Sequence, residues 1–256
     1  MSRENKNKLK DLISQWPRGT VHTSSYLHAI GYGYDLLAKY KKNGWIIPIG
    51  RGAWRLAGDD VDWQGGIYAL QQELILPVHI GGKTVLEEMG YGHYGVMGRR
   101  MCYLYGPLGT KLPRWFVGYD WSVDLQYAAT NLFPSGLSDT FTNSSFEKIK
   151  IKTSTVERAV FEMLYFVPVR QGYDEAQKIL AGLLTLRPKM LQLLLETCTS
   201  VKVKRLFMVM AEEAKMPWVE DIKLDKVNFG QGSRQLVRDG VWHKKYQITI
   251  PLTRDL

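Results

Sequence analysis

Residues 33–56 have the sequence GYDLLAKYKKNGWIIPIGRGAWRL, and this stretch decides the fold expected for the beginning of the chain. The spacing of Leu36, Leu37 and Tyr40 predicts a helix over residues 33–43 with one buried stripe. Gly44 is typical of the position just after a helix. Two short apolar segments then flank Gly50-Arg51-Gly52, which predicts a β-hairpin.

The residues before this stretch predict two more helices. Leu9, Leu12, Ile13 and Trp16 share one side of a helix over residues 3–15. A short second helix begins near the capping residues 23–25 and ends at about Ile30. Three helices followed by a hairpin predict a winged helix-turn-helix, in which the third helix enters the major groove of DNA. The alternative is a small helical domain that packs on a partner protein.

Positive charge is concentrated in this segment. The whole chain carries a net charge of +9, and residues 1–56 hold ten Lys and Arg against three acids, a net charge of +7. Such a concentration favours a polyanionic partner. A solvated basic surface without a partner is the simpler interpretation of charge alone.

Beyond Gly58 the patterns predict a larger domain of mixed α/β (α+β) class. The expected domains are therefore residues 1–58, a winged helix-turn-helix, and residues 59–256. The expected elements of the second domain are helices over 63–74, 84–89, 174–184 and 188–197, strands over 78–80, 101–105 and 146–152, and a loop over 134–145. Ser154–Glu157 has the pattern of a capping box that opens a helix ending before Pro168. A final hairpin is expected to turn at Asp239-Gly240.

A second basic cluster lies at the start of a helix that Ser200 is expected to cap. Lys202, Lys204 and Arg205 occupy its first turns, where cations oppose the helix dipole. An anionic partner at the start of this helix is one reason for a protein to accept that cost. Tolerance of a solvated helix end is the alternative.

Several classes of protein are not expected from the sequence. Cys102 and Cys198 are too few for a disulfide framework, and residues 179–186, the most apolar stretch, are far short of a membrane span. A cytoplasmic protein without a membrane partner is expected. The five histidines show no zinc-binding spacing. We therefore expect no catalytic residues, no metal and no cofactor. Asp221-Ile222-Lys223 only weakly resembles a nuclease signature.

A set of short motifs, in order along nearly the whole chain, resembles the AbiEi antitoxins of type IV toxin–antitoxin (abortive infection) systems. In the first part they are Gly31-Tyr32, Leu36-Leu37-x-x-Tyr40, Gly44-Trp45, Ile49-Gly50-Arg51-Gly52-Ala53, Gly58-Asp59, Trp63, Tyr68-Ala69-Leu70-Gln71, Val78-His79-Ile80-Gly81-Gly82, His93-Tyr94 and Leu112-Pro113-x-Trp115-Phe116. In the second part they are Glu157-Arg158-Ala159, Glu162-Met163-Leu164, Leu186-Arg187-Pro188, the run from Ser200 to Phe207, and Lys245-Tyr246.

The resemblance implies a transcriptional repressor that binds inverted repeats in its own promoter. It also implies an antitoxin that counteracts a nucleotidyltransferase toxin without needing a stable complex with it. One motif departs from the family: where similar proteins often have Tyr-Ser-Arg, this chain has Tyr32-Gly33-Tyr34. A serine cap and a basic base reader are therefore absent, and the operator sequence is not carried over.

On this basis Lys202, Lys204 and Arg205 are the candidate antitoxin surface or a second DNA contact. The candidate DNA-binding residues of the first domain fall into two groups. Those expected to face the major groove are Tyr34, Asp35, Ala38, Lys39 and Lys42. Those expected to contact phosphates are Ser24, Ser25, Lys41, Arg51 and Arg55, with the minor groove as the alternative place for Arg51. Two other functions remain open from the sequence: a ligand-responsive regulator unrelated to a toxin, and a DNA-targeted nuclease.

Overall fold

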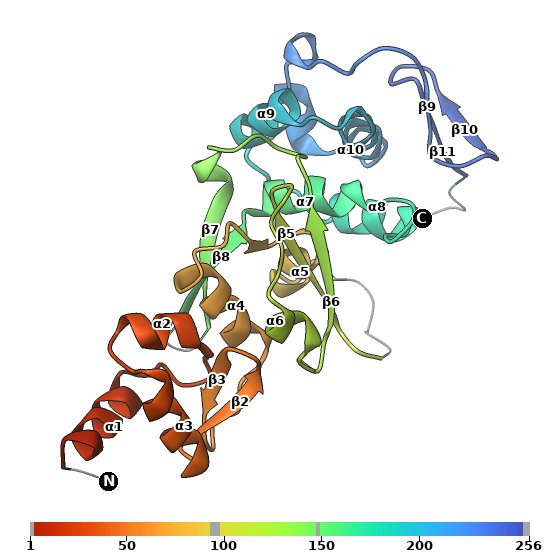
Figure 1. The fold of residues 1–256 in the computed structure, drawn as a ribbon. Coiled ribbons are helices and arrows are strands. Elements are labelled where there is room, and N and C mark those ends of the chain that lie inside the picture. Colours follow the sequence, from red (N-terminus) through yellow and green to blue (C-terminus); the bar gives the residue numbers. More distant parts are fainter. Residues whose placement is uncertain (1–2, 93–97, 147–148, 253–256) are drawn as a thin grey trace. The chain divides into compact units, whose positions relative to one another are not determined.

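The computed structural model describes residues 3–92, 98–146 and 149–252 (Figure 1). The chain divides into two compact units. The N-terminal unit contains residues 1–79, 109–125 and 143–152, and the C-terminal unit contains residues 80–108, 126–142 and 153–256. The unit that holds the first helices therefore extends beyond the boundary expected at Gly58 and takes in two later segments.

Three helices and a small antiparallel sheet begin the N-terminal unit (Figure 1). The helices are α1 (Arg3–Gln15), α2 (Ser24–Ala29) and α3 (Tyr34–Lys42). The sheet has the order β1-β3-β2 and is built from β1 (His22–Thr23), β2 (Ile46–Gly50) and β3 (Ala53–Leu56). This arrangement confirms the expected winged helix-turn-helix, with the β2–β3 hairpin as its wing.

One hydrophobic cluster holds these elements together. Its buried members come from all three helices, the α2–α3 turn and the hairpin: Leu9, Leu12, Trp16, Leu27, Tyr32, Leu37, Tyr40, Ile46 and Leu56. Burying a large apolar side chain contributes roughly 1.5–3 kcal/mol. The cluster therefore fixes α3 and the wing on a single rigid base.

Two further helices belong to the N-terminal unit. Asp62 caps α4 (Trp63–Gln72) by accepting hydrogen bonds from the backbone N–H groups of Gln64 and Gly65. Helix α6 (Arg114–Gly118), which the sequence patterns did not predict, packs against β2. It brings Trp115 so close to Gly50 that a Cβ at residue 50 would lie 2.7 Å from that of Trp115. A segment far along the chain therefore supports the wing.

A five-stranded sheet has the order β6-β5-β4-β8-β7. Its strands are β4 (His79–Ile80), β5 (Met101–Gly106), β6 (Asp124–Ala129), β7 (Phe141–Phe146) and β8 (Ile149–Ser154). Strands β4 and β8 are parallel, with Ile80 opposite Thr153. In β8, Ile149 and Ile151 are buried while Lys150 and Lys152 are exposed, as the alternation of the sequence predicts.

The C-terminal unit contains the remaining helices. They are α5 (Gly82–Glu88), α7 (Val156–Tyr165), α8 (Tyr173–Ala181), α9 (Pro188–Thr197) and α10 (Val201–Glu213), with the 3₁₀ turns η1 (Ser138–Thr140), η2 (Pro217–Asp221) and η3 (Leu224–Lys226). The rings of Phe161 and Phe207 stack with centroids 4.5 Å apart, and Phe207 stacks on Trp218 at 5.4 Å. This stack joins α7, α10 and η2.

A second three-stranded sheet ends the described chain. It has the order β10-β11-β9, from β9 (Arg234–Gln235), β10 (Gly240–His243) and β11 (Ile248–Pro251). Strand β10 is antiparallel to β11 and β9 is parallel to it. In the part of the chain that the structure describes, no helix has the length and hydrophobicity to cross a membrane.

Three expectations about local structure were wrong. The final hairpin turns over residues 244–247, and Gly240 already lies in β10, where a Cβ would come within 2.2 Å of the Ile250 carbonyl oxygen. Part of the expected loop over 134–145 is the strand β7, whose polar sequence shows no hydrophobic alternation. The N-cap of α7 is Thr155 rather than Ser154.

Candidate nucleic-acid interface

Helix α3 presents two opposite surfaces. Leu37 and Tyr40 are buried in the cluster, with 1% and 0% of their surface exposed. Tyr34, by contrast, is 67% exposed. The other expected groove-facing residues, Asp35, Ala38, Lys39 and Lys42, are also exposed, as is Lys41, which was expected to contact phosphate. The structure thus brings together the side chains that the sequence assigned to one face.

The charges of α3 are unevenly distributed along the helix. Lys39, Lys41 and Lys42 lie in its last turn, and Asp35 lies in its first. This polarity stabilises the helix through its dipole. None of the three lysines forms an ion pair with any residue of the described ranges. Their positive charge is therefore available to an anionic partner.

Helix α3 begins without a side-chain cap. Its N-cap is Gly33, which makes no side-chain hydrogen bond. The turn before it is held from the other side, because Tyr32 is buried and its hydroxyl donates to the Lys8 carbonyl oxygen at 3.2 Å. Glycine at residue 33, where similar proteins often have serine, thus removes a side-chain cap. The contact of Tyr32 with α1 still holds the start of the helix in position.

The wing turns at Arg51-Gly52. Gly52 has φ of +87°, a left-handed conformation that favours glycine. Arg51 precedes it and is exposed. A register shift between Pro48 and Gly50 in the β2–β3 pairing marks the end of the hairpin. The turn geometry therefore presents Arg51 at the tip of the wing.

The two serines expected to contact phosphate lie at the start of α2 and differ in their surroundings. The Ser24 hydroxyl accepts a hydrogen bond from Trp54 Nε1 at 2.8 Å, and its backbone N–H donates to the Gly52 carbonyl oxygen at 2.8 Å. Ser24 thereby links α2 to the wing. Ser25 is exposed, with its hydroxyl 3.1 Å from that of Thr23.

Arg55, also expected to contact phosphate, has a side chain that is already engaged inside the protein. It is half-buried, and its Nη1 donates to the backbone carbonyl of Asp59. The carboxylate of Asp59 is in turn bound by Arg18 at 2.6 Å. Arg55 is thus part of an internal network that supports the wing.

A surface hollow beside the start of α3 reveals a residue that sequence reasoning missed. It is lined by residues of α1, of the α2–α3 turn and of α3: Lys8, Gly31, Gly33, Tyr34, Asp35, Leu36 and Lys39. Lys8 is exposed and lies 31 positions before Lys39, so only the packing of α1 brings these two cations to one hollow. The helical periodicity of α1 indicated its buried side but not this neighbour.

Glu73 is a second missed residue, and it fixes the start of α2. Its carboxylate accepts hydrogen bonds from the Thr23 backbone N–H at 2.7 Å and the Thr23 hydroxyl at 2.9 Å, and it also contacts His22 Nδ1. The Glu73 side chain is only 2% exposed. Because Glu73 follows α4, these bonds explain why α4 belongs to the same compact unit as the winged helix.

The second basic cluster lies on α10 and is not a surface patch. Arg205 is 2% and Lys204 is 5% exposed. Lys202 Nζ donates to the carbonyl oxygens of Tyr165 and Val167, at 2.7 Å each, and Lys204 Nζ donates to that of Asn228. Burial lowers the pKa of both lysines. These cations therefore act inside the protein.

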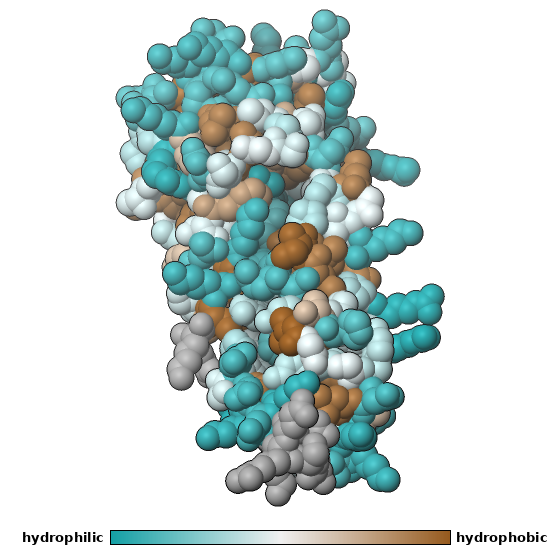
Figure 2. Space-filling view, turned by 60° about the vertical axis from the view of Figure 1, so that its left-hand side comes forward, coloured by the Kyte–Doolittle hydropathy of each residue, from teal (hydrophilic) through white to brown (hydrophobic). Residues whose placement is uncertain are grey.

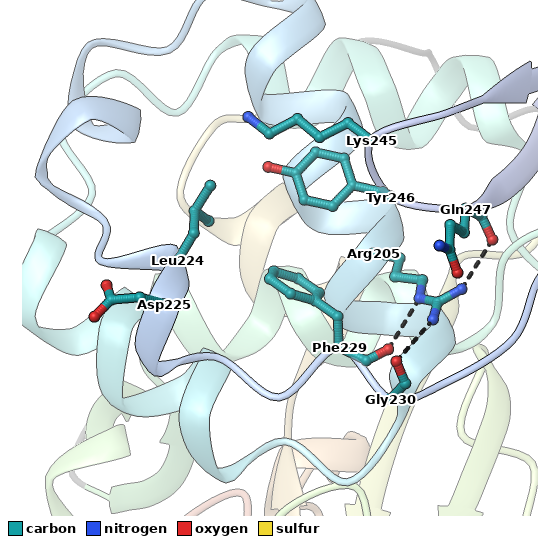
Figure 3. A pocket seen from close by; sticks show the side chains of 8 residues that line it. All are labelled: Arg205, Leu224, Asp225, Phe229, Gly230, Lys245, Tyr246 and Gln247. Atoms are coloured by element: carbon teal, nitrogen blue, oxygen red, sulfur yellow. Dashed lines mark hydrogen bonds between the residues drawn. The ribbon is translucent and has the colours of Figure 1, made fainter.

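Arg205 holds the segment that leads into the last sheet (Figure 3). Its guanidinium donates to the carbonyl oxygens of Phe229, Gly230, Gly232 and Gln247 over distances of 2.7–3.2 Å. It lines a hollow of about 380 Å³ together with Phe229 and Tyr246. The burial of Lys204 and Arg205, with Lys202 half-buried, argues against the antitoxin surface or second DNA contact expected at these three cations.

The face drawn in Figure 2 is mostly hydrophilic, with hydrophobic residues in small separate patches. Within the described residues no group of three or more His, Cys, Asp or Glu could hold a metal ion. What α3 and the wing present to solvent instead is a set of exposed, unpaired cations on a helix and a turn.

Comparison with known proteins covers both units. Residues 5–97 match the N-terminal domain of the transcriptional regulator AbiEi antitoxin, and residues 99–251 match the transcriptional regulator AbiEi antitoxin of type IV toxin–antitoxin systems. The chain belongs to the AbiEi family. The expected resemblance is confirmed.

The fold is also found in a solved structure. The RV2827C protein from Mycobacterium tuberculosis is 14% identical and has a TM-score of 0.59. The likeness covers 97% of this chain and 91% of that one. No curated protein matches the chain.

The AbiEi motifs of the C-terminal unit are largely structural. Arg158 and Glu162 form a buried ion pair at 2.7 Å, and Glu162 also accepts from the Ser154 hydroxyl at 2.6 Å and the Gly82 N–H at 3.1 Å. Arg187 binds Glu157 through two nitrogens, at 2.8 and 2.9 Å. The AbiEi motif His93-Tyr94 lies outside the described residues.

Proposed function

We propose that this AbiEi-family protein binds double-stranded promoter DNA through α3 and the wing and represses its own operon in the cytoplasm. The observation that carries the proposal is the division of α3 into a buried stripe and an exposed face with three unpaired lysines. A rigid helix of about two to three turns with this polarity suits the major groove. The concentration of charge in residues 1–56 supports it.

In this proposal the exposed face of α3 supplies the base contacts. Tyr34, Asp35, Ala38, Lys39 and Lys42 face the base edges, where Lys binds guanine and Asp accepts from cytosine. Ser25, Lys41 and Arg51 hold phosphates, and Lys8 joins them from α1. Ser24 and Arg55 take a smaller part because their side chains already make internal hydrogen bonds.

We also propose that the protein counteracts a nucleotidyltransferase toxin, without a requirement for a stable complex. Membership of the AbiEi family supports this role. In this scheme the protein is an antitoxin and not an enzyme. Inverted repeats in the promoter are the expected operator, since two copies of a winged helix bind such sites one per half-site.

The experiment that tests DNA binding is a gel shift on the protein's own upstream DNA, with random competitor, at about 50 and 200 mM salt. We expect a specific shift that weakens at the higher salt. A shift no stronger than that of the competitor would contradict the proposal. The toxin role is tested separately, by rescue of cells that express a nucleotidyltransferase encoded beside this gene.

A further inference from the structure

The last sheet carries a second region of exposed positive charge. Residues 223–251 contain six Lys and Arg against two Asp, a net charge of +4, and together with residues 1–56 they exceed the net charge of the whole chain. All six cations are exposed: Lys223, Lys226, Arg234, Arg238, Lys244 and Lys245. Of these, Lys245 is paired, with Glu212 at 2.6 Å. Four of the six, Arg234, Arg238, Lys244 and Lys245, lie in or close to the strands of the last sheet.

An exposed tryptophan lies on the outer face of the same sheet. Trp242 is 48% exposed, and it is paired across the strands with Thr249, which is paired with Gln235. The neighbouring positions of β11, Ile248 and Ile250, are buried. Because successive residues of a strand point to opposite faces, Trp242, Thr249 and Gln235 form a row on the face away from the core.

Two unpaired cations flank this row. Arg238 lies just before β10 and Lys244 just after it, so they stand at the two ends of the strand that carries Trp242. Gln235 Nε2 donates to the Arg238 carbonyl oxygen at 3.2 Å, which fixes the approach to the strand. Neither cation forms an ion pair with a residue of the described segments.

The buried cations make this face rigid. Arg205 binds carbonyl oxygens of residues 229, 230, 232 and 247, which lie just before β9 and just before β11. Figure 3 shows the bonds to Phe229, Gly230 and Gln247. The Tyr246 hydroxyl donates to Glu212 on α10 at 2.5 Å. The sheet is therefore mounted on α10, and little ordering of its backbone is needed when a ligand binds.

We propose that the outer face of the β9–β11 sheet binds single-stranded nucleic acid. A base stacks on the indole of Trp242, and Arg238 and Lys244 neutralise phosphates on either side. An exposed aromatic ring on a sheet with flanking cations suits single strands, because their bases are free to stack. The site is independent of the winged helix and its proposed duplex ligand.

The test is fluorescence anisotropy of the full-length protein with labelled oligouridine or oligothymidine of roughly 12 nucleotides. We expect binding that weakens about tenfold in Trp242→Ala and at least as much in the double variant Arg238→Ala/Lys244→Ala. Trp242→Phe should retain most of the affinity, since a phenyl ring still stacks. Circular dichroism verifies the fold of each variant.

Matched controls separate this site from the winged helix. Trp45→Ala removes another exposed tryptophan, 45% exposed, and should leave oligonucleotide binding unchanged. Lys39→Ala/Lys42→Ala should weaken promoter binding only. The proposal is overturned if the wild-type protein does not bind the oligonucleotide, if Trp242→Ala binds like the wild type, if Lys39→Ala/Lys42→Ala abolishes oligonucleotide binding, or if a blunt duplex of equal length competes equally.

Discussion

Helices α3 and α10 each carry three cations within two turns, yet the structure uses them in opposite ways. Lys39, Lys41 and Lys42 are exposed on α3 without ion pairs to described residues, whereas Lys204 and Arg205 are buried on α10. The difference lies in what covers each helix. One side of α3 is left open, while residues 203–211 of α10 are all buried. A cluster of cations in a sequence therefore indicates a binding surface only when one side of its helix is uncovered.

The two clusters also differ energetically. An exposed lysine keeps its hydration and contributes little to folding. The α10 cations form hydrogen bonds with backbone carbonyl oxygens in place of water. These bonds are charge-assisted, and they are strengthened by the low dielectric of the protein interior. Removing a cation from α3 is therefore expected to weaken DNA binding. Removing one from α10 is expected to lower the free energy of unfolding.

The largest effect is expected for Arg205→Ala. The substitution removes the guanidinium donor from four carbonyl oxygens, of which that of Gln247 keeps the Arg234 backbone N–H at 2.9 Å. We expect a loss of roughly 3–5 kcal/mol in the free energy of unfolding. Urea denaturation followed by tryptophan fluorescence measures it. The matched control is Arg234→Ala, an exposed arginine, which should remain within about 0.5 kcal/mol of the wild type. Equal stabilities of the two variants would remove the contrast between the helices.

The double substitution Lys39→Ala/Lys42→Ala is expected to weaken promoter binding by about tenfold or more, because base contacts are each worth about 1–3 kcal/mol. Binding to random DNA should weaken less. Titrations by anisotropy on both DNAs give the ratio. Lys189→Ala, an exposed lysine on α9, serves as the control. An equal loss on both DNAs would assign these lysines to the phosphates instead.

A smaller, uniform effect is expected for Lys41→Ala and for Arg51→Ala. Each removes one phosphate contact, so the slope of log affinity against log salt should fall in magnitude by about 1. All sequences should weaken similarly. An Arg51→Ala effect confined to one operator would show that the wing tip distinguishes sequences, which would place it in the minor groove.

The smallest effect is expected for an ion pair that lies between the two situations, because its cation is exposed and its anion is buried. It joins Arg187 to the carboxylate of Glu157. Burial raises the pKa of Glu157, but hydrogen bonds from Arg187 lower it by more, so the net pKa is below 4.5. This pair therefore stabilises the fold above about pH 4.5 and loses its contribution as pH falls through the lowered pKa.

Glu157→Gln should accordingly reduce the stability at neutral pH by less than about 1 kcal/mol and flatten its decline in acid. Chemical denaturation at several pH values between 3 and 7 follows both changes. The expected role of the pair would be wrong if the variant lost stability in acid as steeply as the wild type.

Local patterns predicted much of the fold, and each miss has its own physical cause. The helices α3 and α9 and the strand β8 have strong periodicity, and their sequences indicated them. β7 was missed because it is an edge strand with a polar sequence, and α6 because five residues show too little periodicity. The final hairpin was misplaced because Asp239-Gly240 has the composition of a turn, whereas the close approach of Ile250 is what requires Gly240.

The candidate interface was predicted in outline and revised in detail. The exposed residues of α3 and Arg51 were assigned from spacing alone. Arg55 was assigned the same way, but its hydrogen bond to Asp59 is not visible in any local pattern. Lys8 was missed for the converse reason, because it reaches the α3 hollow only through the packing of α1.

The sequence by itself determined the winged helix, the position of α3 within it and the concentration of charge around it, since these depend on residues close together in the chain. Only the tertiary structure decided that α4 and α6 support the wing, that Lys204 and Arg205 of α10 are internal, and that the aromatic ring of Trp242 is exposed on the last sheet. The physical reason is that burial depends on what packs against a side chain, and in each of these cases the covering segment comes from a distant part of the chain.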